Sequence, residues 1–170
     1  YSNCTSLEKV KLSNTIQTIN SAAFRWCTSL KQIKIPASLE ETAMAYDYTG
    51  PFSGSGLESV EFEKGTTKIA QRLFKGCKKL KEIDIPNSVK TIEREAFEEA
   101  TSLTVISFPE NLESIKESAF KGCTSLKEIS IPDSVKKIEN EAYSNCTSLE
   151  KVKLSNTIQT INSAAFRWCT

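Results

Sequence analysis

The sequence predicts an α/β solenoid, a single domain over residues 1–170 built from about seven stacked units of 23 residues. Its cysteines recur in steps of 23 residues, apart from one double step and one step of 50, at Cys4, Cys27, Cys77, Cys123, Cys146 and Cys169. Within each step, apolar and polar residues first alternate and then follow a wider spacing. A lone unit offers too few apolar side chains to offset the entropy of ordering it, so the units must stack.

The first half of each unit predicts a short β-strand. A leucine follows each cysteine position by three residues, and two further apolar rows come next: Val10, Ile33, Val60, Ile83, Ile106, Ile129 and Val152, then Leu12, Ile35, Phe62, Ile85, Phe108, Ile131 and Leu154. This alternation with polar residues is typical of a strand with one buried face. Proline ends the strand in four units, because it has no N–H to donate: Pro36, Pro86, Pro109 and Pro132.

The second half of each unit has the pattern Ser-Val-x-x-Ile-x-x-x-Ala-Phe. We interpret Val89–Ile92 as extended and Glu95–Glu99 as about one helical turn. The alternative is an eight-residue helix on the outer face, which the β-branched start of the segment disfavours. Stacking should place the strands of successive units in parallel ladders.

One unit is irregular. The 50 residues from Cys27 to Cys77 equal 23 plus 27, which places Gly54 at the cysteine position and a four-residue insertion within 43–52. Thr42 stands where other units have isoleucine. The insertion brings an unusual apolar load, and we expect Phe52 or Tyr46 to refill the position of the missing phenylalanine: Met44, Tyr46, Tyr48 and Phe52. Insertions in repeat proteins form surface loops, so this one is a candidate binding loop, with repair of the insertion as the alternative.

These residues closely resemble the bacterial BspA-like leucine-rich repeat family, whose 23-residue unit reads LxxIxIPxSVxxIxxxAFxxC. The resemblance covers essentially the whole chain, with one atypical unit. It implies a right-handed solenoid, with a parallel β-sheet on the concave face and short strand or helical-turn segments on the convex face. It also implies a bacterial cell-surface or secreted protein that adheres to host proteins or other cells, and no catalytic residues.

Residues 1–28 and 143–170 are identical, at an offset of 142 residues. The other units have diverged, so we interpret the chain as a window on a longer array whose super-repeat is 142 residues. Neither end carries a polar cap, and uncapped solenoid ends expose apolar edges. End-to-end self-association is therefore expected.

Composition excludes several classes of function. Lys+Arg 22 against Asp+Glu 21 gives a formal charge of +1, which offers no bulk attraction to nucleic acid or acidic membranes. No apolar run approaches the roughly 20 residues that span a bilayer, and no signal peptide is present in residues 1–10. Histidine is absent, and no CxxC pair, nucleophile–base pair or glycine-rich phosphate loop occurs. We expect no enzyme activity, no cofactor and no metal.

The six cysteines share one position in the unit, where Ala100 also occurs, so we expect a stack of buried free thiols. The residue before them varies widely: Asn3, Trp26, Gly76, Glu99, Gly122, Asn145 and Trp168. This variety argues against a required left-handed backbone there and places the position at the surface. Trp26 and Trp168 are candidate aromatic anchors, although they could simply cover the rim.

The outward residues of the strands are the main candidate site. The central row runs Lys11, Lys34, Glu61, Asp84, Ser107, Ser130, Lys153, and the row before it Lys9, Gln32, Ser59, Glu82, Val105, Glu128, Lys151. Lys34 should pair with Glu61, whereas Glu61 and Asp84 form a like-charge pair. Their neighbours complete an acidic cluster that could attract a basic ligand or a cation: Glu61, Glu63, Glu82 and Asp84. The alternative is a solvated face whose charges only maintain solubility.

The sequence thus predicts a non-catalytic recognition module that binds a protein ligand on its concave face. The candidate contacts are Lys34, Glu61, Glu63, Glu82, Asp84, Tyr46, Tyr48 and Phe52. The alternative is a rigid spacer in a long surface protein whose recognition residues lie elsewhere.

Overall fold

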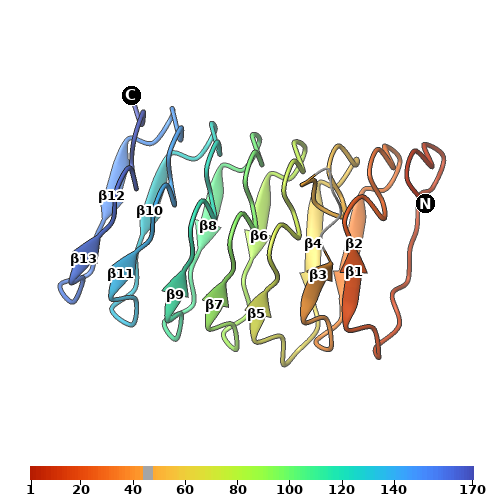
Figure 1. Cartoon of the computed structure of the whole chain (residues 1–170), viewed down its shortest axis with the longest axis horizontal. Coiled ribbons are helices and arrows are strands. Elements are labelled where there is room, and N and C mark those ends of the chain that lie inside the picture. The colour runs from red at the N-terminus through yellow and green to blue at the C-terminus, as the bar shows by residue number, and fades with distance from the viewer. Residues whose placement is uncertain (44–47) are drawn as a thin grey trace.

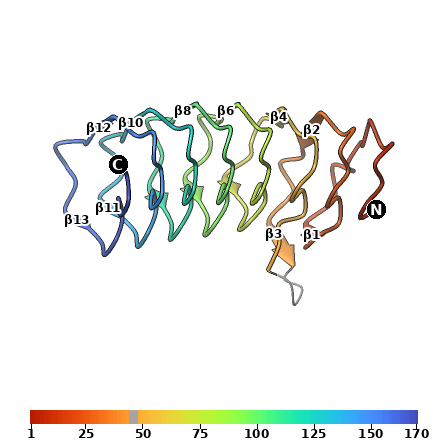
Figure 2. The same ribbon diagram turned by 90° about the horizontal axis from the view of Figure 1, so that it is seen from above.

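The computed structural model describes residues 1–43 and 48–170, which form a coil of stacked turns with one strand on each of two sides (Figure 1). The front strands are β2 (Gln32–Ile35), β4 (Ser59–Phe62), β6 (Glu82–Asp84), β8 (Val105–Ser107), β10 (Glu128–Ser130) and β12 (Lys151–Lys153). The back strands are β1 (Thr18–Asn20), β3 (Glu41–Ala43), β5 (Lys68–Ile69), β7 (Thr91–Ile92), β9 (Ser114–Ile115), β11 (Lys137–Ile138) and β13 (Thr160–Ile161). Figure 2 shows the front strands in a nearly straight row, so no strong curvature is built into the front face.

The front strands pair in parallel, as predicted, but in three separate ladders: β2 with β4, β6 with β8, and β10 with β12. Each ladder joins equivalent positions of successive turns, so Asp84 lies opposite Ser107 and Ser130 opposite Lys153. In β2, β6, β8 and β10 the inward side chains are buried and the outward ones exposed, which is the period-two pattern of the sequence. The ladder is interrupted between β4 and β6 and between β8 and β10.

The back strands form a five-stranded parallel sheet, from β5 to β13, and a separate pair, β1 with β3. The insertion lies between β3 and β5, where Figure 2 shows β3 displaced outward. Thr42 occupies the isoleucine position, opposite Ile19, and its hydroxyl donates a hydrogen bond to the carbonyl of Gln71. The threonine is therefore bonded to the turn that lies beyond the insertion.

The segment between back and front strands is a series of tight turns, and the described residues contain no helix. The helical turn expected at Glu95–Glu99 is thus not found, and neither is the helical part of the α/β assignment. Every second N–H bonds to the neighbouring turn: Phe97 N donates to Ala119 O at 2.8 Å, while Ala96 N donates locally to Glu93 O at 3.2 Å. An α-helix would direct both of these N–H groups along its own axis.

The position before each cysteine has a left-handed backbone, which corrects the expectation drawn from its variety. The φ angles are 61° for Asn3, 59° for Trp26, 70° for Gly76, 59° for Glu99, 74° for Gly122, 61° for Asn145 and 58° for Trp168. All of these residues except Trp168 donate their N–H to a carbonyl of the next turn: Glu99 N, for example, donates to Lys121 O at 2.8 Å. These bonds support the left-handed conformation whatever side chain is present, and Trp168 adopts the same conformation without such a bond to any described residue.

An aromatic column runs through the core along the solenoid axis. Neighbouring rings are stacked with centroids 5.2 to 6.2 Å apart, in the order Tyr1, Phe24, Phe52, Phe74, Phe97, Phe120, Tyr143 and Phe166. Offset stacking at this separation adds to the free energy of area burial. Phe52 therefore refills the phenylalanine position of the irregular turn, as expected.

The cysteines form a second inward column, and all six are free thiols. The thiol of Cys123 donates to Phe97 O at 3.3 Å and that of Cys146 to Phe120 O at 3.2 Å, so each joins two turns. Burial raises the pKa of Cys77 and of Cys146 to about 12, which leaves these thiols protonated and unreactive.

The cysteine position of the irregular turn holds Ser55, not Gly54. Ser55 is buried, and its N–H donates to Phe52 O at 2.9 Å, as Cys77 N does to Phe74 O at 3.1 Å. Gly54 takes the left-handed position before it, with φ 67°. A Cβ on Gly54 would lie 2.6 Å from the ring of Trp26, because that indole covers the glycine.

Replacing Phe97 with alanine should lower the free energy of unfolding by about 3–5 kcal/mol, because it empties the middle of the aromatic column. Urea unfolding followed by far-UV circular dichroism measures the change. The matched control is Val105→Ala, at a side chain that is 59% exposed, which should change stability by less than about 0.5 kcal/mol. Equal effects of the two changes would contradict the column's role in stability.

Replacing Gly54 with alanine should destabilise the protein more than replacing Gly65. Both glycines have positive φ, but a Cβ at Gly65 meets nothing nearer than 3.9 Å, so Gly65→Ala carries the backbone strain alone. Gly54→Ala adds a clash with Trp26, for a further loss of about 1–3 kcal/mol. The measurements are urea midpoints and the tryptophan emission maximum, and an unchanged emission would show that the indole does not cover Gly54.

Candidate functional site

The outward side chains of the front strands form two parallel rows that the ladders bring side by side. The predicted pair of Lys34 and Glu61 is present, with Nζ and Oε1 separated by 2.6 Å across β2 and β4. The hydrogen bond to Glu61 raises the pKa of Lys34. A second pair, Lys31 with Glu58 at 3.0 Å, flanks it, so two lysines and two glutamates pair with each other at this end of the front face.

The predicted acidic cluster is divided by its contacts. Glu61 is paired with Lys34, and Oε2 of Glu63 accepts a hydrogen bond from Ala37 N at 3.1 Å. Glu63 stands where other units have proline, and this bond stabilises the turn instead. Within the described part of the chain, Glu82 and Asp84 have no ion pair or side-chain hydrogen bond. They are the carboxylates of the cluster that remain available to a ligand.

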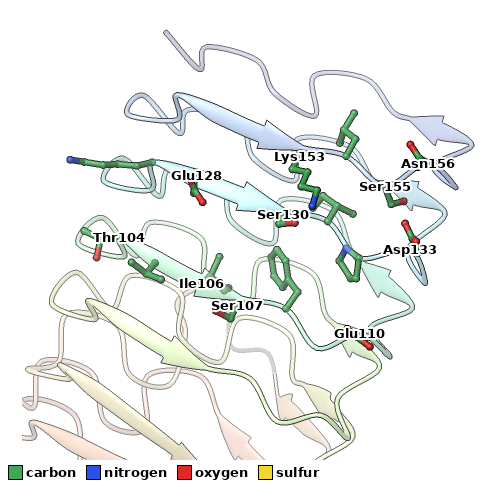
Figure 3. A pocket seen from close by; sticks show the side chains of 16 residues that line it. Thr104, Ile106, Ser107, Glu110, Glu128, Ser130, Asp133, Lys153, Ser155 and Asn156 are labelled. Atoms are coloured by element: carbon green, nitrogen blue, oxygen red, sulfur yellow. The ribbon is translucent and has the colours of Figure 1, made fainter.

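A groove of about 1110 Å³ lies on the front face across β8, β10 and β12 (Figure 3). It is centred where the central row has short side chains, Ser107 and Ser130, in place of the lysines and acids of other turns. Val105 is 59% exposed on its wall, and the side chain of Lys153 extends from β12 towards Ser130 (Figure 3). The groove was not predicted, although two serines at successive positions of an otherwise charged row were the available signal.

The insertion contributes one exposed aromatic side chain among its described residues. Tyr48 is 61% exposed, and the guanidinium of Arg72 lies 5.2 Å from its ring centroid. Phe52 is fully buried in the aromatic column, so it has no surface for a ligand. Tyr46, the other predicted contact, lies outside the described residues.

The predicted aromatic anchors lie on the turn side, away from the front strands. Trp26 is 47% exposed above Gly54, and Trp168 is 55% exposed with the guanidinium of Arg167 at 3.8 Å from its ring centroid. Trp26 therefore acts at least as a cover for the glycine backbone.

A buried ion-pair network on the turn side was not predicted. Arg72 and Glu95 form a bidentate pair, with Nε–Oε2 at 2.6 Å and Nη2–Oε1 at 2.9 Å, and both side chains are less than a tenth exposed. Lys75 joins them, 2.7 Å from Glu95 and 2.6 Å from Glu98. The partners are about one unit apart in sequence, so the network ties successive turns together.

The network sets opposite pKa shifts on its two carboxyls. Burial alone would raise the pKa of Glu95, but the hydrogen bonds from Arg72 and Lys75 outweigh it and lower this pKa to about 2. Burial raises the pKa of Glu98, although Lys75 opposes the change, and repulsion from Glu95 adds to it. Glu95 is therefore the carboxylate on which the buried guanidinium depends.

Glu95→Gln should lower the free energy of unfolding at pH 7 by about 2–4 kcal/mol, because it leaves Arg72 buried without its counter-charge. The folded pKa of about 2 lies below the reference value of 4.5, so the carboxylate stabilises the fold above that reference value and less as pH falls. The stability gap between the two proteins should thus narrow from about pH 5 towards pH 2. Urea titrations across this range measure it.

The control is Glu113→Gln, which breaks the exposed pair with Lys90 at 2.9 Å and should change stability by less than about 1 kcal/mol. A gap that stays constant with pH would contradict the assignment of the stabilising charge to Glu95.

The described residues, 1–43 and 48–170, include no group of three or more acidic or cysteine side chains placed to hold a metal ion. They also include no helix that is long and apolar enough to cross a bilayer.

Solved structures share this fold. TpLRR, a leucine-rich repeat protein of T. pallidum, is 23% identical over 86% of this chain and 67% of its own, with a TM-score of 0.69. A leucine-rich cell surface protein of Faecalibacterium prausnitzii is 26% identical over 100% of this chain and 53% of its own, with a TM-score of 0.68. The pneumococcal vaccine antigen PcpA is 21% identical over 89% and 47%, with a TM-score of 0.53.

This chain therefore spans between 47% and 67% of these three proteins. No curated protein sequence matches it. The model of the BspA type leucine-rich repeat region matches in six copies, over residues 1–46 and 48–170. With its period, its stacked turns and this match, the chain belongs to the BspA-type leucine-rich repeat family.

Proposed function

We propose that the chain is a non-catalytic protein-binding or adhesion module of a bacterial surface or secreted protein, and that its ligand binds the front face. The observation that carries this proposal is the groove across β8, β10 and β12. It combines an exposed valine with free polar groups on a rigid array of strands, which is the composition of a recognition surface.

The likeness to structures supports the surface location. One similar protein is described as a cell surface protein and another as a vaccine antigen. A surface role for this chain follows by analogy of fold and family. The proposal gives Asp84 and Glu82 a direct contact with the ligand, and it gives Lys34 and Glu61 a place at the edge of the contact area.

A rigid spacer is the second candidate, favoured by the continuous aromatic column and the inter-turn ion pairs. These features make the stack stiff along its axis, whatever its front face binds. In that case recognition lies in another part of a longer protein.

Removing residues 101–123 should distinguish the two functions. The deletion takes out one whole turn, with β8 and β9, and joins positions that are equivalent in the repeat. A spacer should tolerate this shortening, whereas a recognition module should lose most of its binding, because one of the three strands that line the groove is removed.

The assay is surface plasmon resonance against a panel of purified extracellular-matrix and cell-surface proteins. The intact chain is compared with the deletion and with an unrelated solenoid. Binding by the intact chain no greater than by the unrelated solenoid would overturn the recognition role. Circular dichroism of the deletion confirms that the remaining turns are folded.

A further inference from the structure

We propose that the groove binds an extended protein segment that crosses the front strands and carries a basic residue, an apolar residue and an acidic residue at alternate positions. This inference rests on the proposed function and names the partner of the same face. Its basis is the order of outward side chains along the solenoid axis: the acidic Asp84, then the short Ser107 and Ser130, then the basic Lys153.

The two ladders fix this order. Asp84 on β6 lies opposite Ser107 on β8, and Ser130 on β10 lies opposite Lys153 on β12. Within the part of the chain that the structure describes, neither Asp84 nor Lys153 has an ion pair or a side-chain hydrogen bond. Asp84 lies beside the groove, on β6, and Lys153 is part of its lining, so the stretch of the central row from β6 to β12 carries two free groups of opposite charge at its two ends. A ligand with the opposite charges at the matching spacing complements them.

The middle of the groove accepts an apolar side chain. Serines 107 and 130 leave space where longer side chains stand in other turns, and Val105 presents 59% of its surface beside them. Phe108 and Pro132 line the same groove. An aliphatic side chain placed here would be covered by apolar atoms on more than one side.

Strand spacing sets the separation of the ligand's charges. Three inter-strand steps separate β6 from β12, two within ladders and one across the interruption between β8 and β10. At about 4.8 Å for each step they span about 14 Å. An extended segment rises about 3.3 Å per residue, so residues four apart are about 13 Å apart and point to the same side. The residue halfway between them also points to that side, which places it over the two serines.

Selection from a displayed library of random nine-residue peptides tests the proposal on the whole chain. We expect enriched peptides with a basic and an acidic residue four positions apart and an apolar residue midway, in either direction. Asp84→Lys should weaken their binding by about tenfold and should itself select peptides with two acidic residues at this spacing. Lys153→Asp should select two basic residues.

Two further variants complete the test. Ser107→Lys fills the middle of the groove with a side chain that the same row already has at Lys11 and Lys34, so the fold should tolerate it. It should weaken peptide binding by about tenfold or more. Lys137→Asp makes the same kind of charge reversal on the back strand β11 and should leave binding unchanged.

The outcomes separate the two proposals. Peptides that bind without regard to Asp84 and Lys153 would overturn this inference and leave the recognition role intact. Selection of no peptide, with a purified protein bound through a site that Ser107→Lys does not affect, would also overturn it. Absence of both peptide and protein binding would overturn the proposed function as well.

Discussion

Every turn of this protein depends on its neighbours to cover its apolar side chains. The identical segments 1–28 and 143–170 show this dependence within one molecule. Ile19 is 3% exposed, whereas Ile161, the same residue in the same local sequence, is 48% exposed. The turn that follows Ile19 covers it, whereas residues 1–170 contain no turn after the one that holds Ile161. Burial is thus a property of a pair of turns, and so is most of the stability.

The backbone obeys the same constraint. Glu99 has a left-handed conformation, which costs a non-glycine residue about 1–2 kcal/mol. Its N–H donates to Lys121 of the next turn at 2.8 Å, and this bond recurs along the stack. A local pattern that suits one helical turn is therefore overridden by hydrogen bonds between turns. Sequence variety at the position misled the prediction because asparagine, tryptophan, glycine and glutamate all adopt the same left-handed conformation there.

Local sequence alone also fails to determine where a strand forms. Residues Lys151–Lys153 form β12, paired with β10, whereas the identical segment at 9–11 is not part of a strand. The repeat period predicted the strand positions and the Lys34–Glu61 pair, because equivalent positions of successive turns must lie side by side. The repeat period could not predict which residue of the irregular turn occupies the cysteine position. A turn lengthened before Phe52 and shortened after Ser55 looks, from its leucines, like a simple insertion.

The candidate site, like the fold, could be predicted from the sequence only in part. Charge rows could be read from the sequence, and they indicated the front face and its switch from basic to acidic residues. Which charges are free could be read only in part, because the Lys34–Glu61 pair was predicted but the hydrogen bond from Ala37 N to Glu63 was not. The Arg72–Glu95 pair was missed because it joins two turn segments interpreted as helical.

The groove arises because two short side chains, Ser107 and Ser130, replace the longer ones found at the same position in the other turns. The inward columns of rings and thiols are constrained, because each side chain must pack against those of the neighbouring turns. The outward side chains of Ser107 and Ser130 face the groove and are free of this packing requirement. Two short side chains create a hollow without any change of backbone, and the adjacent turns supply its charged borders. Recognition on such a scaffold can therefore change by substitution in the outward rows while the stack keeps its stability. Such substitution is restricted where an outward residue also packs against the backbone, as Trp26 does over Gly54. Replacing such a residue would alter the packing of the turn as well as the surface.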